Sequence, residues 1–196
     1  MLQENKFISK EVAKIKLGLT TNKPILLALG GTRDDKGLDS LVESLRNVKN
    51  DFYLLIAGKE ETFKKEFIES KIISYKDNVK ILLHFLSDDE VNLCLIASDF
   101  IVLPYKKYFD GASGPLGEGV AMEKIIIRPN HGSLGDIIRN NHLGYTFQSE
   151  NTESLTKILD LALTESFHFD NAYYDYQNAL NPDRFKKEYN KIFQLL

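Results

Sequence analysis

Two glycine-containing segments hold the residues of this sequence that could bind a charged ligand. The first, residues 30–37 (GGTRDDKG), lies between an apolar run and an amphipathic stretch. Gly30 and Gly31 would let the backbone turn sharply and approach a ligand, and free N–H groups at the start of the following helix would attract an anion. Arg33 and Lys36 would add a planar guanidinium and a point charge, which together suit a diphosphate. The alternative is a tight strand–helix turn with solvated charges, and composition alone leaves both interpretations open.

The second segment is residues 110–118 (DGASGPLGE), after the apolar run FIVLPY. Pro115 is suited to the first turn of a helix, so the N–H groups of Ser113 and Gly114 would be free to point at a phosphate or sugar oxygen. Asp110 and Glu118 could face one cavity and accept hydrogen bonds from the neighbouring hydroxyls of a sugar or ribose. Alternatively, Asp110 caps a turn and Glu118 is an ordinary acid near a helix start.

Six short apolar runs recur along the chain and predict the sheet that positions these segments. None of them alternates polar and apolar residues, so each is expected to be covered on both faces, as in a parallel sheet flanked by helices. The runs are residues 25–29, 52–57, 79–85, 100–105, 125–129 and 143–147.

Helical patterns lie between the runs. They are an apolar stripe over residues 38–48, the Phe63–Phe67 pair, a capping box at Ser87 and Glu90, a stripe over residues 155–163, and a last helix beginning at Asn181-Pro182. This alternation predicts an α/β fold, a Rossmann-like, doubly wound, parallel six-stranded sheet. Such sheets bind ligands at the carboxyl ends of their strands, which is where both glycine-containing segments lie.

Composition excludes several classes of protein. The 196 residues carry a formal net charge of −3, which argues against general binding to nucleic acid. One cysteine and four histidines exclude a disulfide scaffold and leave few ligands for a structural zinc site. No apolar run approaches the roughly 18 residues needed to span a bilayer, so we expect a cytoplasmic protein without membrane insertion, with the membrane periphery as an alternative for a full-length protein. The loop at residues 30–37 matches neither the dinucleotide fingerprint nor the Walker A loop.

With both segments in view, the chain resembles the C-terminal, donor-binding domain of GT-B fold glycosyltransferases, in particular the retaining family 4 (group 1) enzymes. Their G-x-x-R-x-x-K-G loop is matched by Gly30, Arg33, Lys36 and Gly37, and their Glu–seven residues–Glu motif by Asp110 and Glu118. The resemblance implies that Arg33 and Lys36 bind the donor diphosphate, that Glu118 holds the ribose and Asp110 the transferred sugar, and that amides of residues 113–116 contact sugar and phosphate.

The resemblance also implies a division of the chain. Residues 1–22 would be a linker and first helix, with Ser9 as N-cap and Val12 and Ile15 facing inward. Residues 23–180 would bind the nucleotide sugar, and residues 181–196 would form a helix packing toward a missing N-terminal domain. The chain would then be one half of a GT-B enzyme, inactive in isolation; a single-domain protein that needs a partner subunit is the alternative. Asp110 replaces the family's first Glu, which shortens the side chain by one methylene.

The expected function is retaining, metal-independent glycosyl transfer in glycoconjugate or polysaccharide synthesis. The donor would be a UDP- or GDP-sugar bound as substrate, without a cofactor, and the acceptor a glycan or lipid held by the other domain. No Asp-x-Asp sequence is present that would clamp a metal-bound diphosphate. A nucleotide-sugar 2-epimerase, a non-catalytic nucleotide-sugar-binding subunit, and an α/β domain for another phosphorylated ligand are the alternatives.

Two further groups of residues are candidates for positions near the donor. His131 follows the run at residues 125–129, near Arg128, and is the best additional candidate for the donor site. The segment at residues 105–108 (YKKY) is expected to be a solvated loop, with the lining of an interdomain cleft as the alternative.

Overall fold

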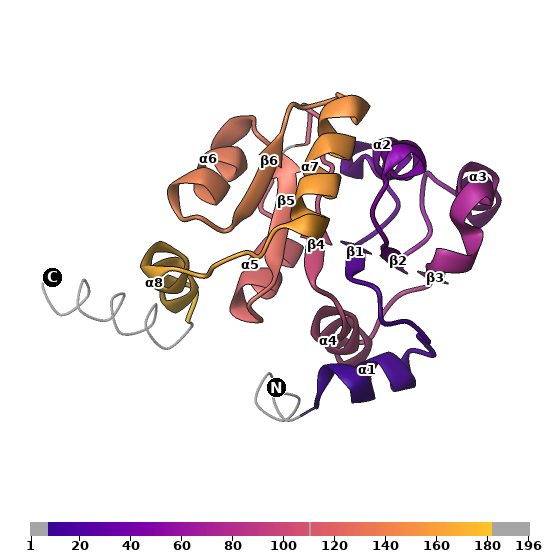
Figure 1. Cartoon of the computed structure of the whole chain (residues 1–196), viewed down its shortest axis with the longest axis horizontal. Coiled ribbons are helices and arrows are strands. Elements are labelled where there is room, and N and C mark those ends of the chain that lie inside the picture. Colours follow the sequence, from indigo (N-terminus) through magenta and orange to yellow (C-terminus); the bar gives the residue numbers. More distant parts are fainter. Residues whose placement is uncertain (1–7, 110, 182–196) are drawn as a thin grey trace, which may run out of the picture.

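The computed structural model describes residues 8–109 and 111–181. Its centre is a six-stranded, all-parallel sheet in the order β3-β2-β1-β4-β5-β6, and Figure 1 shows these strands side by side. The strands are β1 (Ile25–Leu29), β2 (Tyr53–Gly58), β3 (Val79–Leu83), β4 (Phe100–Val102), β5 (Ile125–Pro129) and β6 (Gly144–Phe147). The direction of strand succession reverses between β1 and β4, which is the position where doubly wound sheets bind ligands. The predicted α/β fold is therefore confirmed.

Helices cover both faces of the sheet (Figure 1). The α-helices are α1 (Lys10–Lys16), α2 (Leu38–Ser44), α3 (Lys65–Lys71), α4 (Asp88–Ala97), α5 (Gly114–Ala121), α6 (Gly132–Asn140), α7 (Thr152–Thr164) and α8 (Asn171–Ala179). Short 3-10 helices occur at η2 (Asp34–Lys36), η3 (Leu45–Asn47) and η4 (Ile73–Asn78). No helix among the described residues is long and apolar enough to cross a membrane.

Two apolar cores form because successive residues of each strand point to opposite faces. In β5, Ile126 packs with buried residues of α4, α5 and α6, whereas Ile127 packs with those of α2, α3 and α7. Both faces of the central strands are buried, which explains why the apolar runs show no alternation.

Most predicted elements are confirmed, with instructive differences. Ser87 and Glu90 form the predicted capping box at the start of α4. Strand β4 ends at Val102, before Pro104, which has no N–H to donate to a neighbouring strand. Helix α3 begins at Lys65, so Phe63 lies outside it, although its ring still stacks on Phe67 at 4.9 Å.

The prediction for the first helix was right about its start and wrong about its inward face. Ser9 is the N-cap of α1, and its side chain accepts a hydrogen bond from the Val12 amide. Val12 and Ile15 are 42% and 75% exposed, and Ala13 is the residue that packs into the core. The small Ala13 side chain allows α1 to lie close to α4, and Lys10 pairs with Asp99 beside it. The helix predicted from Asn181-Pro182 lies outside the described residues, apart from Asn181 itself.

Candidate functional site

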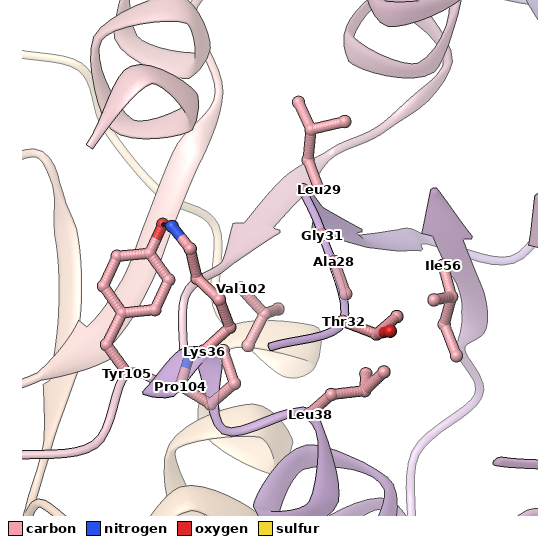
Figure 2. A pocket seen from close by; sticks show the side chains of 11 residues that line it. Ala28, Leu29, Gly31, Thr32, Lys36, Leu38, Ile56, Val102, Pro104 and Tyr105 are labelled. Carbon is pink, nitrogen blue, oxygen red and sulfur yellow. Dashed lines mark hydrogen bonds between the residues drawn. The ribbon is translucent and has the colours of Figure 1, made fainter. Parts of the chain in front are cut away.

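A small hollow opens at the carboxyl ends of β1, β2 and β4, where the strand order reverses (Figure 2). Its lining comes from the strand ends, the following loop, and the segment after β4: Ala28, Leu29, Gly30, Gly31, Thr32, Lys36, Leu38, Ile56, Val102, Pro104 and Tyr105. Three of the predicted residues, Gly30, Gly31 and Lys36, therefore line one hollow.

Glycine is required at two of the backbone positions around this hollow. A Cβ on Gly58 would lie 2.1 Å from the carbonyl oxygen of Gly30, because the ends of β1 and β2 approach each other closely there. Gly37 has a φ of 66°, and a Cβ on it would lie 2.0 Å from the carbonyl oxygen of Pro104. Backbone in this left-handed region is tolerated by glycine and strained for other residues. The second position explains why the loop at residues 30–37 ends in glycine.

Thr32 joins this loop to the segment after β2. Its amide donates to the Lys59 carbonyl at 3.0 Å, and its hydroxyl donates to the Phe63 carbonyl at 2.8 Å. The same hydroxyl accepts from the Glu61 amide at 2.8 Å, and the Phe63 amide donates to the Thr32 carbonyl at 3.0 Å. With Thr32 only 2% exposed, these bonds fix the loop firmly in place.

Lys36, at the end of η2, has aromatic neighbours rather than acidic ones. Its Nζ donates to the Tyr105 hydroxyl at 3.1 Å and lies 4.2 Å and 4.5 Å from the ring centroids of Tyr105 and Phe109. Figure 2 shows the side chain extending to the hydroxyl of Tyr105. Among the described residues, no carboxylate oxygen lies within 4 Å of this nitrogen. Burial, together with the charge of Arg33, lowers the pKa of Lys36 to about 8, while Asp35 opposes this shift.

Tyr105 connects Lys36 to the second predicted segment. Its hydroxyl lies 3.0 Å from Oγ of Ser113. Ser113 is the N-cap of α5, and its Oγ accepts a hydrogen bond from the Leu116 amide at 3.3 Å. Pro115 occupies the first turn of α5, as predicted. The start of this helix therefore lies beside Lys36, so the two glycine-containing segments meet at the same edge of the sheet.

The acidic residues of the second segment are only partly described. Asp110 lies outside the described residues. Glu118 is exposed, and its Oε1 lies near the start of α5, 3.7 Å from where a Cβ on Gly114 would be. Partial desolvation of the carboxylate, with a smaller effect from the charge of Asp88, raises the pKa of Glu118.

Arg33 is half-exposed and already holds a carboxylate. Its Nε and Nη2 donate to the two carboxylate oxygens of Asp35 at 2.9 Å and 2.6 Å. This bidentate pairing raises the pKa of Arg33 and lowers that of Asp35. Arg33 would have to exchange Asp35 for a phosphate in order to bind one.

His131 lies outside the hollow. It is the N-cap of α6, and its Nδ1 is buried without a hydrogen-bond partner. Its carbonyl accepts a hydrogen bond from Nη1 of Arg128 at 3.2 Å. Burial, then the charges of Arg128 and Lys107, lower the pKa of His131.

Tyr105 is a residue of this site that was not predicted from the sequence. The expectation of a solvated loop at residues 105–108 holds for Lys107 and Tyr108, which are exposed, but not for Tyr105, which is 2% exposed. Lys106 is bound to Asp34 and Asp39. The signal was available, because Ile101, Leu103 and Tyr105 fall at alternate positions and belong to the same core. Pro104 interrupts strand pairing but not this alternation.

These features define a doubly wound α/β domain with a cation and a glycine backbone at its switch point. The sequence matches the family described as glycosyl transferases group 1 over residues 9–179, and the chain belongs to that family. A search of curated proteins found no match.

Several solved structures share the fold. Sucrose-phosphate synthase from Thermosynechococcus elongatus superposes with a TM-score of 0.75 at 18% identity, covering 97% of this chain and 50% of that one. A glycosyltransferase from Rickettsia africae gives a TM-score of 0.71 at 24% identity, covering 90% and 47%. The C-terminal domain of a group 1 glycosyl transferase, LpcC, from Francisella tularensis gives a TM-score of 0.65 at 18% identity, covering 86% and 95%. The chain thus spans about half the length of the first two and matches one half of the GT-B fold.

Proposed function

We propose that this chain is the donor-binding half of a retaining, metal-independent glycosyltransferase that uses a nucleoside-diphosphate sugar. The observation that carries the proposal is the position of Lys36. Its ammonium lies at the switch point of the sheet, beside the backbone of Gly30 and Gly31 and next to the start of α5, without a carboxylate partner among the described residues. An anion that binds there gains a cation, and its own charge offsets the cost of burying that cation.

The chemistry of transfer requires such a site. When the bond between sugar and diphosphate breaks, negative charge grows on the leaving diphosphate, and preorganised cations and N–H groups stabilise it. Lys36 and the free amides at the start of α5 would perform this role, with Arg33 joining after release of Asp35. Glu118 would accept hydrogen bonds from the ribose, and Asp110 from the transferred sugar. No group of three or more His, Cys, Asp or Glu side chains that could hold a metal ion occurs within residues 8–109 and 111–181.

Two structural neighbours are described with nucleotides. Anabaena HepE was solved with UDP and glucose (TM-score 0.75, 13% identity), and starch synthase IV from Arabidopsis thaliana with ADP and acarbose (TM-score 0.68, 18% identity). By analogy, the partner of this site is a UDP-sugar or another nucleotide sugar, with a GDP-sugar as the other expected donor.

We further propose that the acceptor, a glycan or a lipid, is held by a separate N-terminal domain in the cytoplasm. This arrangement would serve glycoconjugate or polysaccharide synthesis. This chain alone would bind donor but transfer little sugar, because transfer requires the acceptor to be positioned beside the donor.

A thermal-shift and calorimetric panel tests the donor site. The panel comprises UDP, GDP, ADP and their glucose or mannose derivatives, added to the whole chain at up to millimolar concentration. A ligand that binds only the folded state raises the melting temperature. Lys36→Ala should weaken binding of the best nucleotide by roughly 10- to 100-fold, the range for a lost hydrogen bond between charged groups.

Two further variants complete the panel. Glu118→Ala should weaken nucleoside diphosphates but not inorganic pyrophosphate, which has no ribose. Lys157→Ala removes an exposed lysine on α7 that pairs with Glu153, and it should bind like the wild type. The proposal fails if no nucleotide raises the melting temperature, or if Lys36→Ala and Lys157→Ala bind equally well.

A further inference from the structure

Arg128 is a buried cation that the donor-site residues do not include. It lies in β5, is 2% exposed, and has Nε buried without a hydrogen-bond partner. Nη1 donates to the carbonyl of His131 at 3.2 Å. Moving an arginine out of water is costly unless an opposite charge compensates it, and burial lowers the pKa of Arg128 to about 10. The stability of the ligand-free chain therefore does not explain why an arginine is present at this position.

The other cations near the edge of the sheet each have a carboxylate. Arg33 binds Asp35, Lys106 binds Asp34 and Asp39, and Lys107 lies 3.7 Å from Glu150. Arg128 and Lys36 differ from these, since neither has a carboxylate oxygen within 4 Å in the part of the chain that the structure describes.

Both of these uncompensated cations lie against Tyr105. The Arg128 guanidinium carbon is 6.0 Å from the centroid of the Tyr105 ring, and the Lys36 ammonium is 4.2 Å from it. Two helix starts add partial positive charge at the same place. The Tyr105 hydroxyl contacts Ser113, the N-cap of the eight-residue α5, and Arg128 contacts His131, the N-cap of the nine-residue α6. Positive charge therefore accumulates around Tyr105. Asp35, which is already paired with Arg33, acts on this cluster only from a longer distance.

We propose that Arg128 is a positioning residue whose buried charge is balanced by a diphosphate bound beside Lys36 and Tyr105. Arg128 does not touch the ligand; it acts through space and through the Tyr105 ring and the His131 carbonyl. A diphosphate diester carries one negative charge on each phosphate, and Lys36 and Arg128 supply one positive charge each. This inference rests on the proposed diphosphate site. It adds to that site a residue that lies outside both glycine-containing segments.

The proposal predicts effects of opposite sign on stability and on binding. Arg128→Met keeps an unbranched chain of four atoms, ending about where Nε of the arginine lies, and removes the charged guanidinium. The ligand-free variant should be at least as stable as the wild type, because a buried charge without a partner is gone. Its affinity for inorganic pyrophosphate should fall by about three- to tenfold, because the attraction at low dielectric is lost. An arginine with a purely structural role would give the reverse: lower stability and unchanged affinity.

Two further variants sharpen the test. Arg128→Lys retains the charge and should bind pyrophosphate within about twofold of the wild type. Lys124→Met is the matched control: this lysine precedes β5 at the opposite edge of the sheet, and its ammonium donates to the carbonyls of Ile96 and Ser98. Removing its charge should leave pyrophosphate affinity unchanged.

The measurements are urea unfolding of the ligand-free chains and calorimetric titration with inorganic pyrophosphate and with UDP. The proposal is overturned if Arg128→Met unfolds at a lower urea concentration than the wild type, or if it binds pyrophosphate as tightly as the wild type. It is also overturned if the wild type binds no pyrophosphate. The proposed function fails separately, if pyrophosphate binds but no nucleoside diphosphate or nucleotide sugar binds more tightly than pyrophosphate does.

Discussion

Lys36, the last residue of η2, and Lys106, which binds Asp34 at the start of η2, have opposite surroundings. Lys106 lies on the acidic side, where its Nζ is 2.8 Å from Asp34 and 3.1 Å from Asp39. Lys36 lies on the aromatic side, against Tyr105 and Phe109. The carboxylates of Asp34 and Asp39 raise the pKa of Lys106, whereas burial lowers the pKa of Lys36 to about 8. Lys106 therefore fixes the loop to the segment after β4, whereas Lys36 has no carboxylate partner among the described residues and is the proposed diphosphate ligand.

Gly37→Ala should lower the stability of the chain most, because Gly37 is the left-handed residue that joins η2 to α2. The variant forces alanine into a φ of 66° and places a Cβ 2.0 Å from the backbone oxygen of Pro104. We expect the free energy of unfolding to fall by about 3 kcal/mol. Gly117→Ala is the control: it lies in α5 with nothing within 4 Å of its Cβ, so it should be neutral or stabilise by up to about 1 kcal/mol. Equal urea midpoints for the two variants would contradict this account.

The second largest effect should be the pH dependence of diphosphate binding, which distinguishes Lys36 from Lys106. Only the protonated Lys36 attracts an anion, and a bound anion raises its pKa. Affinity should therefore decline as pH rises above about 8, by up to tenfold per unit until the pKa of the complex is reached. Lys106 stays protonated over this range because its pKa is raised. Calorimetric titration from pH 7 to 10 should show this decline in the wild type and no such decline in Lys36→Met.

The same shift has a consequence for the ligand-free chain. The folded state binds its proton on Lys36 less tightly than the unfolded state, whose lysine has a pKa near 10.4. Between about pH 8 and 10.4 the unfolded state therefore carries more protons on this residue, so its contribution to stability increases with pH across that window. The contribution of Lys36 is obtained by subtracting the free energy of unfolding of Lys36→Met from that of the wild type at each pH. If this difference decreases between about pH 8 and 10.4, the lysine is not desolvated in the folded state.

Tyr105→Phe should have the smallest effect, since it removes one oxygen and keeps the ring. The lost hydroxyl contacts Lys36 at 3.1 Å and the buried Ser113 at 3.0 Å. We expect a loss of about 1–2 kcal/mol in the free energy of unfolding. Tyr174→Phe, at a partly exposed position on α8, should change stability by less than about 0.5 kcal/mol. If the two substitutions cost the same, the contact between the two segments contributes nothing to stability.

The sheet and the order of its elements could be predicted because apolar runs and helix caps are local signals. The runs at residues 25–29 and 125–129 coincide with β1 and β5, and the Ser87 capping box starts α4 as predicted. The inward face of α1 could not be found in the same way. Val12 and Ile15 are the larger apolar side chains, but close packing against α4 selects the small Ala13.

The glycines and the cations of the candidate site could be predicted from the sequence, but which of the cations pairs with a carboxylate could not. The types and spacing of Gly30, Gly31 and Lys36 indicate an anion-binding loop, and these residues line the hollow. Nothing local shows that Asp35 occupies Arg33 and leaves Lys36 without an acid. Arg128 in an otherwise apolar strand was a signal of a buried charge, but its neighbour Tyr105 comes from another strand end and is brought there only by the fold.

Thr32 has a bearing on how this edge of the molecule can vary among related chains. Its amide, carbonyl and hydroxyl together tie the loop after β1 to the segment after β2 through Lys59, Glu61 and Phe63. An insertion in either segment would leave buried polar groups of the other unsatisfied. The two segments should therefore change length together or not at all.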